Sequence, residues 1–193
     1  MDAGPRTVNL AYIPTLILRG LDNAGKSTIV ARWMGEKTEG IAPTFGFQIH
    51  TLPYPTEQGQ VQLHLWDIGG QRTIRAYWRN YYESTDGLVF VFDAAAMGAG
   101  EQDRLTESLL ELQTLLEGGR LASTSVLILA NKQDCKQAIR AEEVERMVRP
   151  LMTSKQHWRV FGCAAVDEAD QGCRSALDWL VGDIAQRLCY TGS

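Results

Sequence analysis

The sequence predicts an α/β fold, with a six-stranded, mostly parallel sheet that contains one antiparallel hairpin and is flanked by about five helices. Short apolar runs alternate along the chain with segments of helical periodicity, which is typical of parallel sheets. One stretch rich in turn-forming residues, at positions 54–59, joins two of the runs directly and predicts the hairpin. The chain has 193 residues, of which 45% are hydrophobic and 22% charged, so it can form one domain with a single core.

The candidate strands are apolar runs bounded by turn-forming residues. They span residues 15–18, 45–53, 60–66, 87–92, 125–130 and 158–162. Helical periodicity is clearest at residues 105–117 and 176–188, where apolar residues recur on one stripe of each helix. We expect both stripes to face the core. Gly118 and Gly119 are expected to end the first of these helices.

Charge and composition exclude several classes of function. The formal net charge is −4, and lysines and arginines are scattered, so a nucleic-acid partner is not expected. No apolar run approaches the roughly 18 residues that a membrane-spanning helix needs. The four cysteines form no metal-ligand spacing, and we interpret them as buried reduced thiols of a cytoplasmic protein. Asp2 replaces the glycine required for myristoylation, and Cys189 is misplaced for prenylation, so no stable membrane anchor is expected.

The strongest motif is a phosphate-binding loop, the P-loop. Residues 20–27 read GLDNAGKS, which matches G-x-x-x-x-G-K-[ST] between a predicted strand and a predicted helix near Lys26. Backbone N–H groups of such a loop surround phosphate oxygens, and the helix N-terminus adds partial positive charge. Lys26 is expected to reach the β- and γ-phosphates, and the Ser27 hydroxyl to bind Mg²⁺. The residues expected to contact nucleotide here are Asp22, Asn23, Ala24, Gly25, Lys26, Ser27 and Thr28. The fold is therefore expected to be that of a P-loop NTPase.

A second motif distinguishes guanine from adenine. Residues 131–134 read NKQD directly after a predicted buried strand. The Asp134 carboxylate can accept two parallel hydrogen bonds from guanine, whereas adenine offers no such pair of donors and would leave the charge unpaired. Asn131 is expected to bond the far edge of the base, and the aliphatic part of Lys132 to cover its face. The backbone N–H of Ala165 is expected to bond the guanine O6 atom.

Two further segments are expected to close on the γ-phosphate. Residues 66–71 read WDIGGQ, in which Asp67 suits Mg²⁺, Gly70 can approach the phosphate because it has no Cβ, and Gln71 can orient an attacking water. Thr44 lies in an upstream loop, and its hydroxyl is expected to complete the Mg²⁺ ligands. Two loops that close on one phosphate make an order–disorder switch.

Taken together and in this order, the motifs resemble those of small GTPases, and specifically of the Arf and Arf-like family. The segments that carry the resemblance are GLDNAGKS at 20–27, STI at 27–29, PTFGF at 43–47, WDIGGQ at 66–71, YWRNYYEST at 77–85 and DWL at 178–180. They are most similar to the Arf-like-two branch, and next to the Arf-like-three branch. The resemblance covers residues 15–188, so we expect a GTPase domain at 15–190. Residues 1–14 contain two prolines and little amphipathic periodicity, and are expected to form a non-helical extension.

The resemblance implies a switch that binds GTP or GDP with Mg²⁺, binds effectors in its GTP state and hydrolyses GTP slowly. Gln71 and Lys26 are the expected catalytic residues. No arginine of this chain is evident beside Asp22, so turnover is expected to need a GTPase-activating protein. Phe47, Trp66 and Tyr81 are expected to form an exposed effector surface rather than core. The resemblance also implies that the hairpin strands slide by two residues along the sheet, which keeps each side chain on its face.

The implied partners are β-sandwich carriers of lipidated cargo and a tubulin-folding cofactor. The protein is expected to be a cytoplasmic monomer that can associate with the cytoskeleton. Three alternatives stay open. An Arf-like-three-type protein would act in release of ciliary cargo. A pseudo-GTPase would bind GTP without useful turnover, although Lys26, Ser27, Thr44 and Gln71 argue against it. A P-loop phosphotransferase such as a nucleoside kinase would need a lid and an acceptor site, and the sequence shows neither.

Overall fold

The computed structural model describes residues 12–56, 59–71, 85–96, 102–117, 119, 121 and 123–191. Its six strands are β1 (Thr15–Arg19), β2 (Phe47–Thr56), β3 (Gly59–Ile68), β4 (Gly87–Asp93), β5 (Ser125–Asn131) and β6 (Trp158–Gly162). They form one sheet in the order β2-β3-β1-β4-β5-β6. The β2–β3 pair is antiparallel and every other pair is parallel, so the predicted mixed sheet is confirmed.

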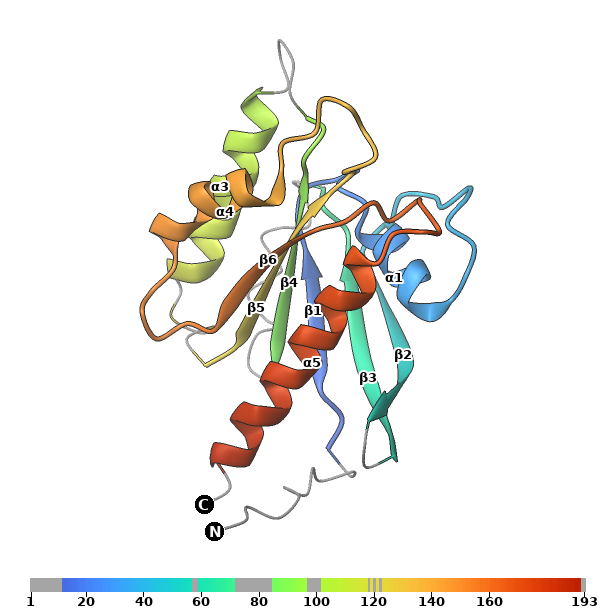
Figure 1. Ribbon diagram of the computed structural model, residues 1–193, viewed down its shortest axis with the longest axis vertical. Coiled ribbons are helices and arrows are strands. Elements are labelled where there is room, and N and C mark those ends of the chain that lie inside the picture. Colours follow the sequence, from blue (N-terminus) through green and yellow to red (C-terminus); the bar gives the residue numbers. More distant parts are fainter. Residues whose placement is uncertain are drawn as a thin grey trace.

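Helices cover both faces of this sheet (Figure 1). The described residues form the α-helices α1 (Lys26–Met34), α3 (Gln102–Glu117), α4 (Ala141–Val148) and α5 (Gly172–Thr191), and a short 3-10 helix, η2 (Arg149–Leu151). Helices α1 and α5 pack on one face, and α3 and α4 pack on the other. Helix α4 was not anticipated from periodicity because it is short. Val144 and Val148, one turn apart, are its two buried residues.

Two hydrophobic clusters, one on each face, form the core. Alternation along β1 shows the division, because Leu16 and Leu18 belong to the cluster under α1 and α5, and Ile17 to the cluster under α3 and α4. The central strand β5 is buried at every position, as expected for a parallel strand covered on both faces. The predicted stripe of α5 is confirmed, since Ala176 and Ile184 are fully buried.

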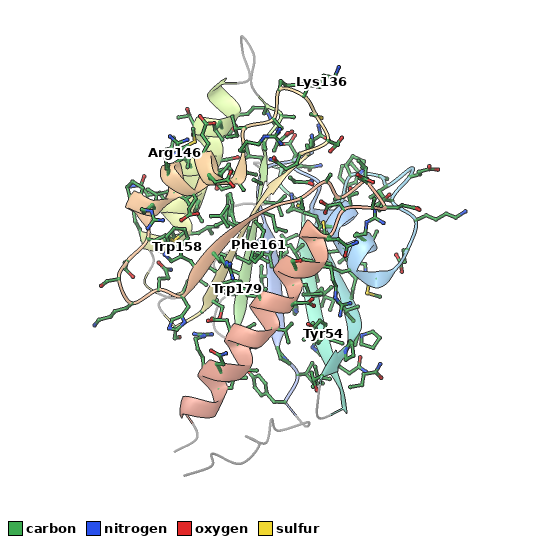
Figure 2. The ribbon with its side chains drawn as sticks, in the orientation of Figure 1. Tyr54, Lys136, Arg146, Trp158, Phe161 and Trp179 are labelled. Atoms are coloured by element: carbon green, nitrogen blue, oxygen red, sulfur yellow. The ribbon has the colours of Figure 1, made fainter. Side chains whose placement is uncertain are left out.

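The hairpin differs from the expectation for residues 54–59. Tyr54 and Thr56 belong to β2 and pair with Val61 and Gly59, so the turn is shorter than predicted. The prolines at 53 and 55 are typical of turns, but β2 is the last strand of the sheet, and an edge strand tolerates proline where no ladder bond is needed. Tyr54, labelled in Figure 2, is buried. Its hydroxyl donates a hydrogen bond of 2.6 Å to Oδ1 of Asp178 in α5.

The beginning of the described chain is held by one carboxylate. The Tyr12 hydroxyl donates to Asp86 Oδ1 at 2.5 Å, and the Thr15 N–H donates to Asp86 Oδ2 at 2.8 Å. The predicted extension lies outside the described residues except for its last three. No helix in the described ranges has the length and apolar character needed to cross a membrane.

Three cysteines of the described chain are free thiols, and two of them, Cys163 and Cys173, are buried. Cys135 is half-buried, which differs from the expectation for it. Hydrogen bonding to Cys173 and burial raise the pKa of the Cys163 thiol, so this thiol stays protonated. A protonated, buried thiol is a poor nucleophile, which fits a packing role.

Candidate nucleotide-binding site

The carboxyl ends of the parallel strands meet at one edge of the sheet, and the loops that follow them carry the predicted site residues. The loop after β1 leads into α1, and the loops after β3, β5 and β6 lie at the same edge (Figure 1). Ligands of open α/β sheets bind at this edge, because the loops there converge without being covered by helices.

The P-loop follows β1, and several of its residues have positive φ values, which most residues avoid. Gly20 and Gly25 have φ values of 137° and 96°, and Asn23, which is not a glycine, has a φ of 59°. Lys26 opens α1, is 6% exposed, and donates from Nζ to the carbonyls of Gly20 at 3.0 Å and Leu21 at 2.8 Å. The loop therefore curves around the lysine ammonium, with the N-terminus of α1 behind it, which is the arrangement that holds phosphate. Thr28 follows in the first turn of α1.

Three oxygen-bearing side chains expected to bind Mg²⁺ come together from the start of α1, the loop before β2 and the end of β3. Ser27 Oγ donates to Asp67 Oδ2 at 2.5 Å and lies 2.8 Å from Thr44 Oγ1, which in turn lies 3.2 Å from Asp67 Oδ2. Asp67 is fully buried, and its Oδ1 atom accepts no hydrogen bond from the described residues. Carboxylate and hydroxyl oxygens are the ligands that Mg²⁺ prefers, so this group of atoms fits the metal.

The segment after β3 lies directly against the P-loop. A Cβ atom on Gly70 would stand 2.2 Å from the backbone nitrogen of Asp22, so only glycine fits at this position. The Gly69 N–H donates to the Gly46 carbonyl at 2.9 Å, which joins this segment to the loop before β2. Gln71 follows and is half-buried. Its role with water stays a prediction.

Asn131 ties three loops together at the expected base-binding end. Its Nδ2 donates to the Ala24 carbonyl at 2.9 Å, and its Oδ1 accepts from the Ala165 N–H at 3.1 Å. The Cys163 thiol donates to the same Oδ1 atom at 3.6 Å. Both polar atoms of Asn131 and the Ala165 N–H therefore have partners within the protein. The contacts of Asn131 and Ala165 with a base therefore stay predictions. The geometry shows that Asn131 holds the loops together.

Lys132 and Asp134 of this motif, which are expected to contact the base, differ in their surroundings. Lys132 has a φ of 68°, and its Nζ pairs with Asp93 Oδ2 at 2.6 Å, which holds its aliphatic part in place. Asp134 is exposed, so its carboxylate is accessible to a ligand. Asp93 was missed in the sequence, although its position at the carboxyl end of β4 is a signal that could have identified it.

Arg104 is the second residue that sequence reasoning missed. Its Nη2 donates to the Asp22 carbonyl at 2.6 Å and lies 3.6 Å from Asp22 Oδ1. The expectation that no arginine of this chain stands beside Asp22 is therefore wrong. The two residues are 82 positions apart, and no motif marks Arg104, so only the packing of α3 reveals the contact.

The expected effector surface is described in part. Phe47 on β2 is 48% exposed, and its ring stacks on Trp66 of β3 with centroids 5.7 Å apart. Ile49, on the same face of β2, is half exposed, whereas Trp66 is half-buried and also packs on the core. Tyr81 lies outside the described residues. The strands thus carry an aromatic pair that is partly exposed and partly core.

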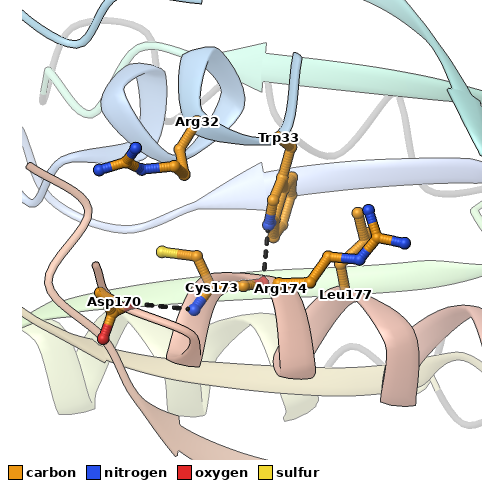
Figure 3. Close-up of a pocket in the computed structure, with 6 residues that line it drawn as sticks. All are labelled: Arg32, Trp33, Asp170, Cys173, Arg174 and Leu177. Carbon is orange, nitrogen blue, oxygen red and sulfur yellow. Dashed lines mark hydrogen bonds between the residues drawn. The ribbon is translucent and has the colours of Figure 1, made fainter. Parts of the chain in front are cut away.

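A separate small pocket lies between α1 and α5 (Figure 3). The Trp33 indole N–H donates to the Cys173 carbonyl at 2.8 Å, and the Cys173 N–H donates to Asp170 Oδ2 at 3.1 Å. Its volume of about 80 Å³ is far below the roughly 300–1,000 Å³ of ordinary ligand pockets. These contacts join the two helices, and the pocket is not the predicted nucleotide site.

Comparison with known proteins agrees with the motifs. The model of the ADP-ribosylation factor family matches residues 12–184. The chain is 44% identical over 174 residues to ADP-ribosylation factor-like protein 2 of Arabidopsis thaliana, covering 90% of this chain and 88% of that one. It is 44% identical to the protein of the same name from Drosophila melanogaster, with the same coverage. It is 37% identical to ADP-ribosylation factor-like protein 3 of Caenorhabditis elegans, covering 88% of this chain and 86% of the other.

A solved structure shows the same fold. The Arl6 BBS3 small GTPase of Trypanosoma brucei, determined with the nucleotide analogue GppNp, aligns with a TM-score of 0.77 and 24% identity. The alignment covers 91% of this chain and 99% of that one. At this identity the likeness concerns the architecture.

Proposed function

Because this chain belongs to the ADP-ribosylation factor family, as an Arf-like small GTPase, we propose that it is a GTP-driven switch that binds Mg²⁺ with its nucleotide. The observation that carries the proposal is the meeting of Ser27, Thr44 and Asp67 within 2.5–3.2 Å of one another. Thr44 lies in the loop before β2, whereas Ser27 is in α1 and Asp67 in β3, so a metal bound by all three would hold that loop closed on the P-loop. A ligand-dependent closure is what a switch requires.

Each part of the site has a task in this proposal. The P-loop amides and Lys26 hold the phosphates, and Ser27, Thr44 and Asp67 hold the metal. Bound Mg²⁺ would neutralise charge on the phosphate oxygens. Asp134 selects guanine, and Lys132, held by Asp93, covers the base. Asn131 joins the P-loop to the loop that contains Ala165 through one hydrogen bond to each.

Hydrolysis is proposed to depend on Gln71, which orients water, and on Lys26, which stabilises charge. Nothing in the described contacts directs Arg104 toward the reacting phosphate, since its closest contact is the Asp22 carbonyl. We therefore keep the proposal that intrinsic turnover is slow and that an activating protein supplies an arginine, an effect typically worth about 10³–10⁵ in rate.

The output is proposed to be effector binding in the GTP state at the Phe47–Trp66 pair. The similarity to Arf-like protein 2 supports β-sandwich carriers of lipidated cargo and a tubulin-folding cofactor as partners in the cytoplasm. The outer edge of β2 can pair with a strand of a β-rich partner. We also propose that β2 and β3 slide by two residues along β1 between the GDP and GTP states.

One experiment tests the switch against the alternatives. Purified protein is loaded with GTP, and single-turnover hydrolysis is followed with and without Mg²⁺, with ATP as the competing nucleotide. A switch binds GTP in preference to ATP and hydrolyses it slowly when Mg²⁺ is present. Binding without Mg²⁺-dependent turnover would identify a pseudo-GTPase, and equal affinity for ATP and GTP would overturn the proposal.

The guanine assignment has its own variant. Asp134→Asn should weaken GTP binding and improve binding of xanthosine triphosphate, because an amide can donate to the oxygen that replaces the exocyclic amine of guanine. Glu143→Gln, a charge-removing change in the neighbouring helix α4, is the matched control and should leave both affinities unchanged.

A further inference from the structure

Arg104 reaches the P-loop from the first turn of α3. The α3 helix begins at Gln102 and is anchored in the core by Leu105 and Leu112, so its first turn has a defined position. The helix macrodipole disfavours a cation at this end of a helix. The hydrogen bond of 2.6 Å to the Asp22 carbonyl and the carboxylate at 3.6 Å offset that effect. The arginine is thus held by Asp22 and not by its own helix.

The shorter contact goes to the backbone, and it orients a peptide group. In a trans peptide the C=O and the following N–H point in opposite directions. Because Arg104 holds the Asp22 carbonyl on its own side, the Asn23 N–H points away from Arg104. A hydrogen bond on the carbonyl also polarises the peptide and strengthens its N–H as a donor.

This peptide needs support from outside the loop. Asn23 has a φ of 59°, a left-handed conformation that asparagine adopts more readily than most residues but that still costs energy relative to glycine, so surrounding contacts help to hold it. On the other side, a Cβ on Gly70 would lie 2.2 Å from the Asp22 nitrogen, so the segment after β3 rests on the same residue. Asp22 therefore stands between Arg104 and Gly70.

We propose that Arg104 is a positioning residue that holds the Asp22–Asn23 peptide in its phosphate-binding orientation and thereby slows nucleotide release. The inference rests on the proposed function, since it concerns the same guanine nucleotide. Arg104 acts through the backbone carbonyl and touches no phosphate. The Asp22 side chain, about half exposed, is the lesser of its two contacts.

The test measures the dissociation rates of fluorescent GDP and of fluorescent GppNp, in Mg²⁺ and with excess unlabelled nucleotide. Arg104→Ala should speed release by about ten- to a hundredfold, the range expected for loss of a hydrogen bond from a charged donor. Arg104→Lys, which keeps one donor and the charge, should restore part of the difference. Arg149→Ala is the matched control, because Arg149 also pairs with a surface carboxylate, that of Glu145, and should stay within about twofold of the unmodified protein.

The same arginine variant, tested in a protein that also carries a change at Asp22, distinguishes the contact of Arg104 with the carbonyl from its contact with the carboxylate. Asp22→Ala removes the carboxylate and keeps the carbonyl, so Arg104→Ala should speed release by about the same factor in this background. Loss of the effect there would show that the arginine acts through the carboxylate and would overturn the proposal. Thermal midpoints of Arg104→Ala and Arg149→Ala should fall by similar amounts, whereas their release rates should differ.

The outcomes also distinguish this inference from the function on which it rests. If the unmodified protein binds guanine nucleotide and Arg104→Ala releases it at the unmodified rate, only the role of Arg104 is overturned. If the unmodified protein binds neither nucleotide, the proposed function fails and the role of Arg104 with it.

Discussion

The Asn131 side-chain amide donates to the Ala24 carbonyl at 2.9 Å, joining the end of β5 to the P-loop 107 residues earlier. A Cβ on Gly25 would lie 2.3 Å from the same Asn131 nitrogen, so the second glycine of the motif makes room for this contact. The Asn131 oxygen accepts from Ala165, which follows β6. One buried asparagine thus links the loop that is expected to hold phosphate to the loop that is expected to hold the base.

Asn131→Ala should lower both stability and nucleotide affinity. The change leaves the buried Ala165 N–H and Ala24 carbonyl without their partner, and each such group costs about 1–3 kcal/mol. The free energy of unfolding in urea and the affinity for GDP measure the two effects. Gln133→Ala removes the side-chain hydrogen bond to Ile139 in the same loop and is the control. Similar GDP affinities for the two variants would argue against a special role for Asn131.

Asp67→Asn should remove the Mg²⁺ dependence of nucleotide release. The amide keeps a similar shape, but it lacks the charge that a buried metal ligand supplies. Release from the unmodified protein should accelerate when EDTA is added, whereas release from the variant should be fast with or without EDTA. A variant that still slows release when Mg²⁺ is restored would exclude Asp67 from the metal site.

Gln71→Leu should keep GTP affinity within a few-fold and lose stimulated hydrolysis. The side chain is proposed to position water and not to hold nucleotide, so binding and turnover should separate. Single-turnover hydrolysis with an activating protein checks this. Normal stimulation of the variant would remove Gln71 from the mechanism.

The aromatic pair should determine the preference of effectors for the GTP state. We expect partners to bind the GTP form more than tenfold more tightly than the GDP form, a coupling of about 1.4 kcal/mol. Phe47→Ala and Trp66→Ala should abolish this preference and leave nucleotide affinity nearly unchanged, as measured by pulldown with GDP- or GTP-analogue-loaded protein. Phe47 is the cleaner site, since Trp66 also packs on the core.

Leu110→Ala is the control for these variants, because Leu110 is similarly exposed but lies on α3. Equal partner binding to both nucleotide forms would assign the pair to packing. If Trp66→Ala unfolds and Phe47→Ala keeps the preference for the GTP form, the pair would likewise be assigned to packing.

Tyr54 should titrate late in the alkaline range. Burial, followed by its hydrogen bond to Asp178, raises the pKa of Tyr54 to about 12 from the usual value near 10. Below pH 10 the folded and unfolded chains both keep this proton. Between pH 10 and 12 only the folded chain keeps it, so stability falls as the pH rises.

Tyr54→Phe should therefore flatten the loss of stability between pH 10 and 12, as measured by urea unfolding. The tyrosinate absorbance should lose a component with a midpoint near 12. The Tyr12 hydroxyl, whose pKa burial and Asp86 also raise to about 12, should remain. If Tyr54→Phe instead removed an absorbance component with a midpoint near pH 10, this result would contradict the buried hydrogen bond.

The residues expected to contact the nucleotide could be predicted from short motifs in the sequence. The P-loop and the NKQD motif needed only a few adjacent residues, because backbone conformation and the end of a strand place them together. The prediction that Ser27, Thr44 and Asp67 share a site also followed from sequence, because each of them belongs to a motif that is expected to bind Mg²⁺ or phosphate. The strands were predicted to within a few residues, because β4 and β5 are continuous apolar runs and β3 alternates between apolar and polar residues.

Tertiary structure decided what depends on distant packing. The strand assignment of Tyr54 and Thr56 depends on β2 being an edge strand, since only there are prolines tolerated. The contact of Arg104 with Asp22 depends on where α3 docks, and no spacing along the chain encodes that position. A motif specifies the groups that meet a ligand, whereas the fold alone determines which remote side chain holds those groups in place.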